Sequence, residues 1–182
     1  MSVDEISSEH ALEHLPRPMA EKAIREFARV LKPGGKLDLK VPDLEDCCRK
    51  FLENPQLQES WYMHTLYGIQ DFRNTPSAPF KDKVNYGQIH YTGFTESRMR
   101  RLLTEAGFVI DRIYKYDGWS TPSLGVEAHI PGMNNGGKRV AFVNNTLNPK
   151  YLSYGDHWED AFRTNGHQLT VVRYEHVGNL SA

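Results

Sequence analysis

The fold is decided by the stretch Phe27-Ala28-Arg29-Val30-Leu31-Lys32-Pro33-Gly34-Gly35-Lys36-Leu37. Phe27 and Leu31 end an apolar series with helical spacing, which predicts a helix from Met19 to Lys32. Proline cannot continue a helix and glycine accepts the left-handed conformation of helix ends, so Pro33-Gly34-Gly35 predicts a stop. The alternation that follows, with apolar residues at every second position, is typical of a strand and involves Leu37, Leu39 and Val41.

Periodicity places further elements on both sides of this stretch. Asp43 and Thr95 suit helix N-caps, and each precedes an apolar stripe with helical spacing. Gly107 is expected to end the second of these helices. Alternating patterns predict strands at residues 3–7, 108–116 and 124–130. The alternation of helices and strands indicates an α/β protein.

Two segments interrupt this pattern. Residues 55–92 form an irregular insertion rich in aromatic rings, which is either a cover over a site or an ordinary packed insertion. Residues 131–137 contain three glycines and predict a linker between residues 1–130 and a C-terminal unit at 138–182. In that unit, strand, helix and strand patterns follow one another as a βαβ unit, which either begins a second domain or completes the first sheet.

Composition excludes several classes of protein. The chain has 182 residues, 39% hydrophobic and 25% charged, and no apolar run of membrane-spanning length. Its 22 Lys and Arg balance 23 Asp and Glu, so we expect neither a nucleic-acid nor a membrane partner. The acidic start differs from a secretory signal, which favours a cytoplasmic location. Cys47 and Cys48 are adjacent, and we interpret them as core thiols rather than as a disulfide framework or zinc knuckle.

Three stretches, in this order, resemble class I S-adenosylmethionine-dependent methyltransferases. They are residues 3–15 (VDEISSEHALEHL), residues 27–45 around the LKPGG turn, and residues 90–108 (HYTGFT and LLTEAGF). The resemblance places them at the fourth strand, the helix and fifth strand that follow, and the late helix with the sixth strand. It implies a partial Rossmann-like α/β sheet, mostly parallel with one antiparallel strand, S-adenosylmethionine as cofactor, and a small or sugar-linked methyl acceptor.

The resemblance begins at the fourth strand, and the glycine-rich cofactor loop of the family, G-x-G-x-G, occurs nowhere in this sequence. We therefore expect a truncated methyltransferase domain; the alternative is a non-catalytic α/β module that does not bind the cofactor. Without the family's first strand, the fourth would have a bare edge. Either a second copy or the C-terminal βαβ unit must cover this edge, and we expect a homodimer. The βαβ unit itself resembles the start of a GT-B glycosyltransferase.

The resemblance also suggests residues for the site. Glu9 and His10 follow the fourth strand, where ligands bind at the carboxyl ends of open α/β sheets, so they are the expected cofactor-binding residues. His14 and His90 are candidates for a catalytic base, since imidazole can accept a proton from the acceptor atom. The residues that flank or lie within the insertion either line an acceptor pocket or pack the insertion against itself; they are Tyr67, Gln70 and Tyr91.

His10-Ala11-Leu12-Glu13-His14 also matches H-x-x-E-H, the inverted zinc-protease motif. That motif needs a helix, on which two histidines one turn apart bind zinc. Here a predicted strand precedes it and Pro16 and Pro18 follow at once. This context disfavours the protease, and from sequence we expect no metal.

Overall fold

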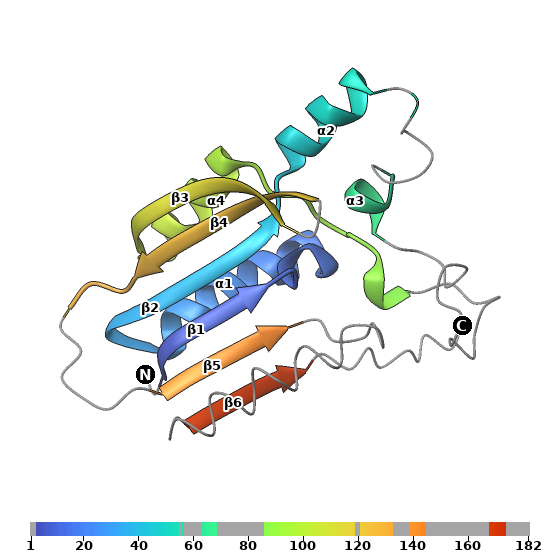
Figure 1. Ribbon diagram of the computed structural model, residues 1–182. Helices are drawn as coiled ribbons and strands as arrows, with labels where there is room; N and C mark the ends of the chain where they lie inside the picture. The colour runs from blue at the N-terminus through green and yellow to red at the C-terminus, as the bar shows by residue number, and fades with distance from the viewer. Residues whose placement is uncertain are drawn as a thin grey trace.

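The computed structural model describes residues 3–54, 56, 63–68, 86–118, 121–132, 139–144 and 168–173. They form a six-stranded mixed sheet with strand order β3-β4-β2-β1-β5-β6, and Figure 1 shows helices α1 and α4 on one face of it. This confirms the predicted α/β fold. The strands are β1 (Val3–Glu9), β2 (Leu31–Pro42), β3 (Val109–Gly118), β4 (Thr121–His129), β5 (Arg139–Asn144) and β6 (Gln168–Arg173). The α-helices are α1 (Arg17–Val30), α2 (Leu44–Glu53), α3 (Met63–Tyr67) and α4 (Glu96–Glu105), and the short 3-10 helices are η1 (Leu12–His14) and η4 (Tyr86–Gln88).

The turn from α1 into β2 explains why the LKPGG stretch is decisive. α1 ends at Val30, two residues before the predicted end, because Leu31 already has the extended backbone of a strand (φ −66°, ψ 140°). Gly34 has φ 72°, a left-handed conformation that glycine adopts without cost from a Cβ atom. Its N–H donates a 2.8 Å hydrogen bond to the carbonyl of Ile130, which ties the turn to the end of β4.

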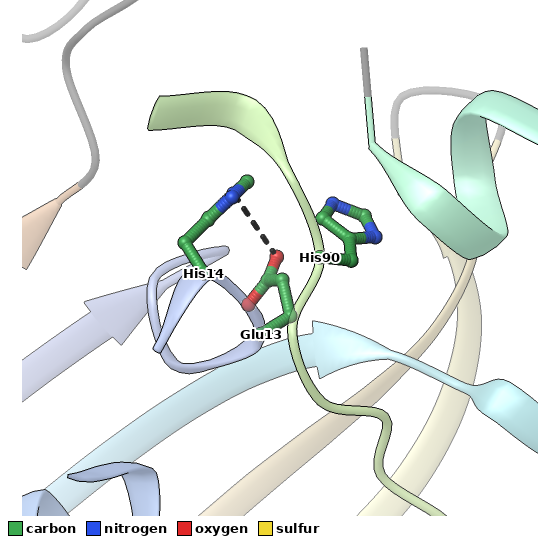
Figure 2. Close-up of side chains that lie close together, drawn as sticks. All are labelled: Glu13, His14 and His90. Carbon is green, nitrogen blue, oxygen red and sulfur yellow. Dashed lines mark ion pairs between the residues drawn. The ribbon is translucent and has the colours of Figure 1, made fainter. Parts of the chain in front are cut away.

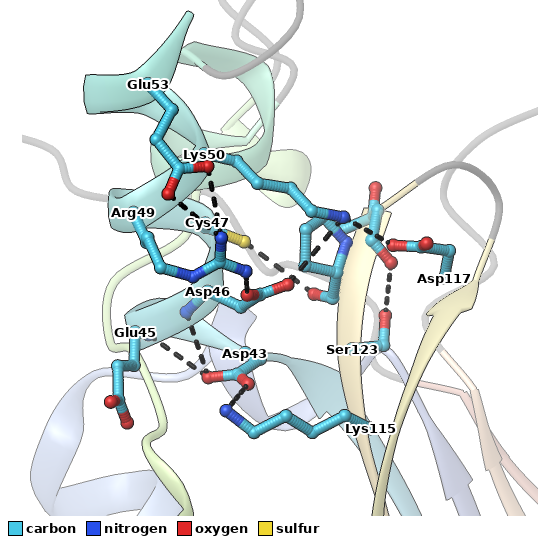
Figure 3. A network of polar contacts seen from close by, with 12 residues as sticks. Asp43, Glu45, Asp46, Cys47, Arg49, Lys50, Glu53, Lys115, Asp117 and Ser123 are labelled. Carbon is cyan, nitrogen blue, oxygen red and sulfur yellow. Dashed lines mark hydrogen bonds and ion pairs between the residues drawn. The ribbon is translucent and has the colours of Figure 1, made fainter.

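The core lies between the sheet and its helices. The predicted alternation in β2 is confirmed, since Leu37, Leu39 and Val41 are all at most 1% exposed. Both N-caps are confirmed as well: the Asp43 carboxylate accepts from the N–H groups of Glu45 and Asp46, and the Thr95 hydroxyl accepts from that of Arg98. Figure 3 shows Asp43 at the start of α2, within a polar network that reaches β3 and β4.

The two adjacent cysteines differ in environment. Cys47 is buried in α2, and burial raises the pKa of its thiol to about 12. Cys48 is exposed, so the expectation of two core thiols is wrong for it. Successive helical positions point about 100° apart, and only one of the two can face the sheet.

The edge of β1 that was expected to be bare is paired in the structure. β4 is antiparallel to both of its neighbours, β2 and β3, and is the one antiparallel strand that the resemblance implied. The other edge of β1 is paired in parallel with β5 of the same chain. β6 continues the sheet in parallel beyond β5. Two strands of the C-terminal unit thus lie in the same sheet as β1, and this edge of β1 is not open to a second copy. The helix expected between the two strands of the C-terminal unit lies outside the described residues, and the likeness to a glycosyltransferase stays a prediction.

Among the helices of the described ranges, none combines the length and the apolar character needed to cross a membrane.

Candidate functional site

The sheet has a switch point between β1 and β5. From β1 the chain continues through α1 to β2 on one side, whereas β5 is followed by β6 on the other. The two strands run in parallel, and Glu9 and Asn144 are partners at their carboxyl ends. In open α/β sheets this is the place where ligands bind. The fold therefore puts the predicted cofactor residues at the edge where a site is expected.

Glu9 and His10 lie at this edge. The Glu9 side chain is 34% exposed and its carboxylate is 3.8 Å from the Lys40 ammonium. His10 has φ 46°, and among the described residues other than glycine it alone has a positive φ. Its N–H donates to the Lys40 carbonyl at 3.0 Å, which fixes this backbone conformation. Conformations of this kind cost energy and concentrate at functional sites.

Glu13 is the buried centre of the same loop, with 1% of its surface exposed. The His10 ring donates from Nδ1 to Glu13 Oε1 at 3.2 Å. Burial alone would raise the pKa of Glu13, but the hydrogen bond from His10 and the charges of the surrounding histidines lower it to about 2. Burial opposes protonation of His10, but the hydrogen bond and charge of Glu13, with the charge of Glu9, outweigh it and raise the His10 pKa.

His14 and His90 meet beside Glu13, although 75 residues separate them in sequence. Their rings make an edge contact with centroids 4.8 Å apart and planes at 73° (Figure 2). His14 Nδ1 donates to the carbonyl of Ile89 at 3.2 Å, and His90 Nδ1 donates to that of Thr65 at 2.9 Å. Burial lowers the pKa of both imidazoles, that of His90 to about 4. Both rings are therefore neutral at pH 7.

A small cavity opens next to this cluster. Its volume is about 20 Å³, room for a water-sized group rather than for a cofactor. Glu13 and His90 form one wall, and α2, α3 and the segment before α4 form the others through Leu44, Cys47, Thr65, Leu66, Thr92 and Gly93.

The insertion meets the site at both of its described ends. The N–H groups of Tyr91 and Thr92 donate to the Glu13 carbonyl at 2.8 and 3.2 Å, and the His90 N–H donates to the Tyr67 carbonyl at 3.0 Å. Tyr67 and Tyr91 are 53% and 43% exposed, so their rings face solvent near the cluster. Gln70, the remaining predicted acceptor residue, lies outside the described residues.

The H-x-x-E-H motif does not form the helix that the protease interpretation requires. Leu12–His14 is a short 3-10 helix, and Glu13 rather than the His10–His14 pair is at its centre. Sequence reasoning missed Glu13 as a site residue, although the motif contained it. Thr65 was also missed, because no periodicity indicates that its carbonyl orients His90.

One comparison with known proteins concerns this same part of the chain. A family model described as a methyltransferase domain matches residues 1–39, which hold β1, the loop from Glu9 to His14, α1 and much of β2. No curated protein matched the chain.

Several solved structures resemble it in part. A SAM-dependent methyltransferase from Methanosarcina mazei is 22% identical, with a TM-score of 0.47, over 72% of this chain and 61% of that one. Magnesium protoporphyrin IX methyltransferase from Synechocystis, with bound SAH, is 16% identical, with a TM-score of 0.44, over 71% and 45%. The 1,6-didemethyltoxoflavin-N1-methyltransferase of Burkholderia thailandensis is 12% identical, with a TM-score of 0.43, over 70% and 44%. The chain thus spans 61% of the first structure's length and less than half of the other two.

Proposed function

We propose that this chain forms part of an S-adenosylmethionine-dependent methyltransferase domain. The observation that carries the proposal is the coincidence of two features in residues 1–39: the match to a methyltransferase domain model, and the loop at the switch point of the sheet. A family match limited to helices and strands would support the fold and would say nothing about function. Here the matched segment also contains Glu9 and His10, which lie where the sheet topology expects a ligand.

The cofactor would supply an electrophilic methyl group, and Glu9 and His10 would hold it. The partly exposed Glu9 carboxylate can accept hydrogen bonds from ribose hydroxyls. His10 Nε2 is buried and has no hydrogen-bond partner among the described residues, so it has capacity for a polar ligand group. These two side chains therefore fit the edge of a nucleoside site.

The methyl acceptor in this proposal is a small or sugar-linked molecule beside Tyr67 and Tyr91. The exposed rings of the two tyrosines offer flat apolar surfaces with a polar group at the tip. Because the pKa values of His14 and His90 are lowered, both are weak bases at neutral pH. We therefore attribute the chemistry to alignment of the acceptor with the methyl group rather than to a histidine base.

Calorimetric titration of the chain with S-adenosylhomocysteine tests the proposal. We expect binding in the micromolar range, weakened at least tenfold by Glu9→Gln and by His10→Ala, since each removes a polar group from the switch point. His129→Ala is the matched control, because this histidine pairs with Asp111 on β3 and β4, away from the switch point. Absence of binding by the folded protein would favour the rival proposal, a non-catalytic α/β module.

A further inference from the structure

Glu13, His14 and His90 bring together three side chains that commonly bind metal ions. One ligand atom from each lies within 4.8 Å of the others. Two of them come from the loop after β1, and His90 comes from the segment that precedes α4. Figure 2 shows the Glu13 carboxylate beside the two rings, with a dashed line to His14. Two imidazoles and one carboxylate are the ligand set of many zinc sites with an open coordination position.

The hydrogen bonds of the two histidines prepare them as ligands. A carbonyl oxygen only accepts hydrogen bonds, so the contacts to Ile89 and Thr65 place the proton of each ring on Nδ1. Nε2 of each neutral ring then keeps its lone pair. In metal sites, ligating histidines almost always donate their other N–H to a carbonyl or carboxylate in this way.

One buried acceptor oxygen at the centre of this cluster lacks a hydrogen-bond donor. His14 Nε2, a lone-pair atom in this tautomer, lies 3.9 Å from the Glu13 carboxylate oxygen Oε1, so two acceptors face each other. Glu13 Oε2 is buried and has no hydrogen-bond partner among the described residues. A buried carboxylate oxygen without a donor is costly. His10 satisfies only the other oxygen, and a bound cation would satisfy this one.

From these contacts we propose that Glu13, His14 and His90 bind one divalent transition-metal ion, with Zn²⁺ as the best match to the ligand set. Zinc ligands at about 2.0–2.1 Å from the ion are about 3.4 Å apart in a tetrahedron, so the side chains close by roughly 1 Å on binding. His10 is a positioning residue that orients the Glu13 carboxylate. The cavity beside Glu13 and His90 leaves room for a water molecule as the fourth ligand.

The proposal revises the sequence-based expectation that no metal binds, and it is independent of the proposed methyl transfer. It also differs from the zinc-protease interpretation, because His90 takes the place that the motif gives to His10. The ion is held where the insertion docks on the loop after β1, so it also links these two segments. Metal binding is thus expected to raise the melting temperature of the protein.

The experiment is titration of untagged, metal-free protein with Zn²⁺ and, separately, with Co²⁺. We expect one ion per chain with micromolar or tighter affinity, and for Co²⁺ the strong visible absorption of a four-coordinate site. Glu13→Gln and His90→Gln should each weaken binding at least 100-fold. His10→Ala should weaken it about 10- to 100-fold, since it acts on the orientation of Glu13 only.

His129→Gln serves as the control for metal binding by surface histidines, because its ring already pairs with an exposed carboxylate, that of Asp111, at 2.9 Å. This variant should bind both ions as the unmodified protein does. Thermal melts of each metal-free variant, followed by circular dichroism, distinguish the loss of a metal ligand from the loss of the fold. If Glu13→Gln does not fold, His90→Gln provides a second test. Absence of stoichiometric binding, or binding equally strong in folded Glu13→Gln and His90→Gln proteins, would overturn the proposal.

Discussion

At the scale of single residues, Asp43 combines two stabilising roles. It is fully buried, its carboxylate caps α2 through the N–H groups of Glu45 and Asp46, and it forms a 2.9 Å ion pair with Lys115 of β3 (Figure 3). Asp43→Ala removes the cap and the ion pair together, so we expect a loss of about 2 kcal/mol in the free energy of unfolding. Urea denaturation monitored by circular dichroism measures it.

Thr95→Ala is the matched control for this loss. Thr95 caps α4 through the N–H of Arg98 and takes part in no ion pair, so removal of its hydroxyl should cost only about 1 kcal/mol. Asp43→Asn, which retains an oxygen for capping and loses the charge, should lose less than Asp43→Ala. Equal losses for Asp43→Ala and Thr95→Ala would show that the ion pair to Lys115 contributes nothing.

Sequence reasoning could place a residue at the site only where a nearby stretch of the chain gave a signal for it. Glu9 and His10 were predicted at the carboxyl edge because the resemblance places them after the fourth strand, and they lie at that edge. The contact between His14 and His90 could not be predicted in this way, because the path of the irregular segment between them determines how close they lie. The buried state of Glu13 was equally hidden, because an acidic residue in a polar loop is ordinarily exposed.

At the scale of elements, a buried ion pair connects β1 to the start of β2. The Lys32 ammonium donates to both carboxylate oxygens of Asp4, at 2.8 and 3.0 Å, and the Asp4 side chain is 1% exposed. Lys32→Met takes the cation away from a buried carboxylate, so we expect a loss of roughly 2–4 kcal/mol in the free energy of unfolding. Thermal and urea denaturation measure this loss.

A surface pair on α1 provides the comparison. Arg29 donates to Glu26 at 2.7 Å, but both side chains are largely exposed, at 67% and 47%. Arg29→Met should therefore change the free energy of unfolding by less than about 0.5 kcal/mol. If Lys32→Met and Arg29→Met cause equally small losses in the free energy of unfolding, the buried pair does not stabilise the contact between β1 and the start of β2.

The same strand shows the limit of pattern-based prediction for elements. β1 buries alternate positions, but two of the three are the polar residues Asp4 and Ser8. A search for alternating apolar residues therefore detects only part of the strand, and β1 extends two residues beyond the predicted end at Ser7. Helix caps were predicted accurately, because a cap is a local hydrogen bond that depends on a few adjacent residues.

At the scale of the whole molecule, the order of the strands in the sheet determines which strand edges stay unpaired. The need to cover the edge of β1 was foreseen from the resemblance, but the choice between a second copy and the C-terminal unit was not. Pairing between strands more than a hundred residues apart has no local sequence signal, since either partner offers the same backbone donors and acceptors. The observed pairing of Ile6 with Ala141 places the C-terminal unit in this position.

Proline at Ala141 tests this arrangement directly. Ala141 lies between Ile6 of β1 and Thr170 of β6, and proline in a strand paired on both sides removes a backbone donor and disrupts the ladder. We expect Ala141→Pro to release β5 from β1, to increase amide hydrogen exchange of residues 5–9 at least tenfold, and to cause self-association visible by light scattering. An exposed strand edge is a template for pairing with another chain.

Val109→Pro is the control, because Val109 is the first residue of β3, the outermost strand, and is 45% exposed. Proline is tolerated at such positions, so exchange in β1 should not change. If Ala141→Pro leaves exchange in β1 slow and the protein monodisperse, then β5 does not protect that edge, and a second copy becomes the better explanation for its cover. Fast exchange with self-association would instead show that one chain completes its own sheet, and that the switch point beside Glu9 depends on the C-terminal unit.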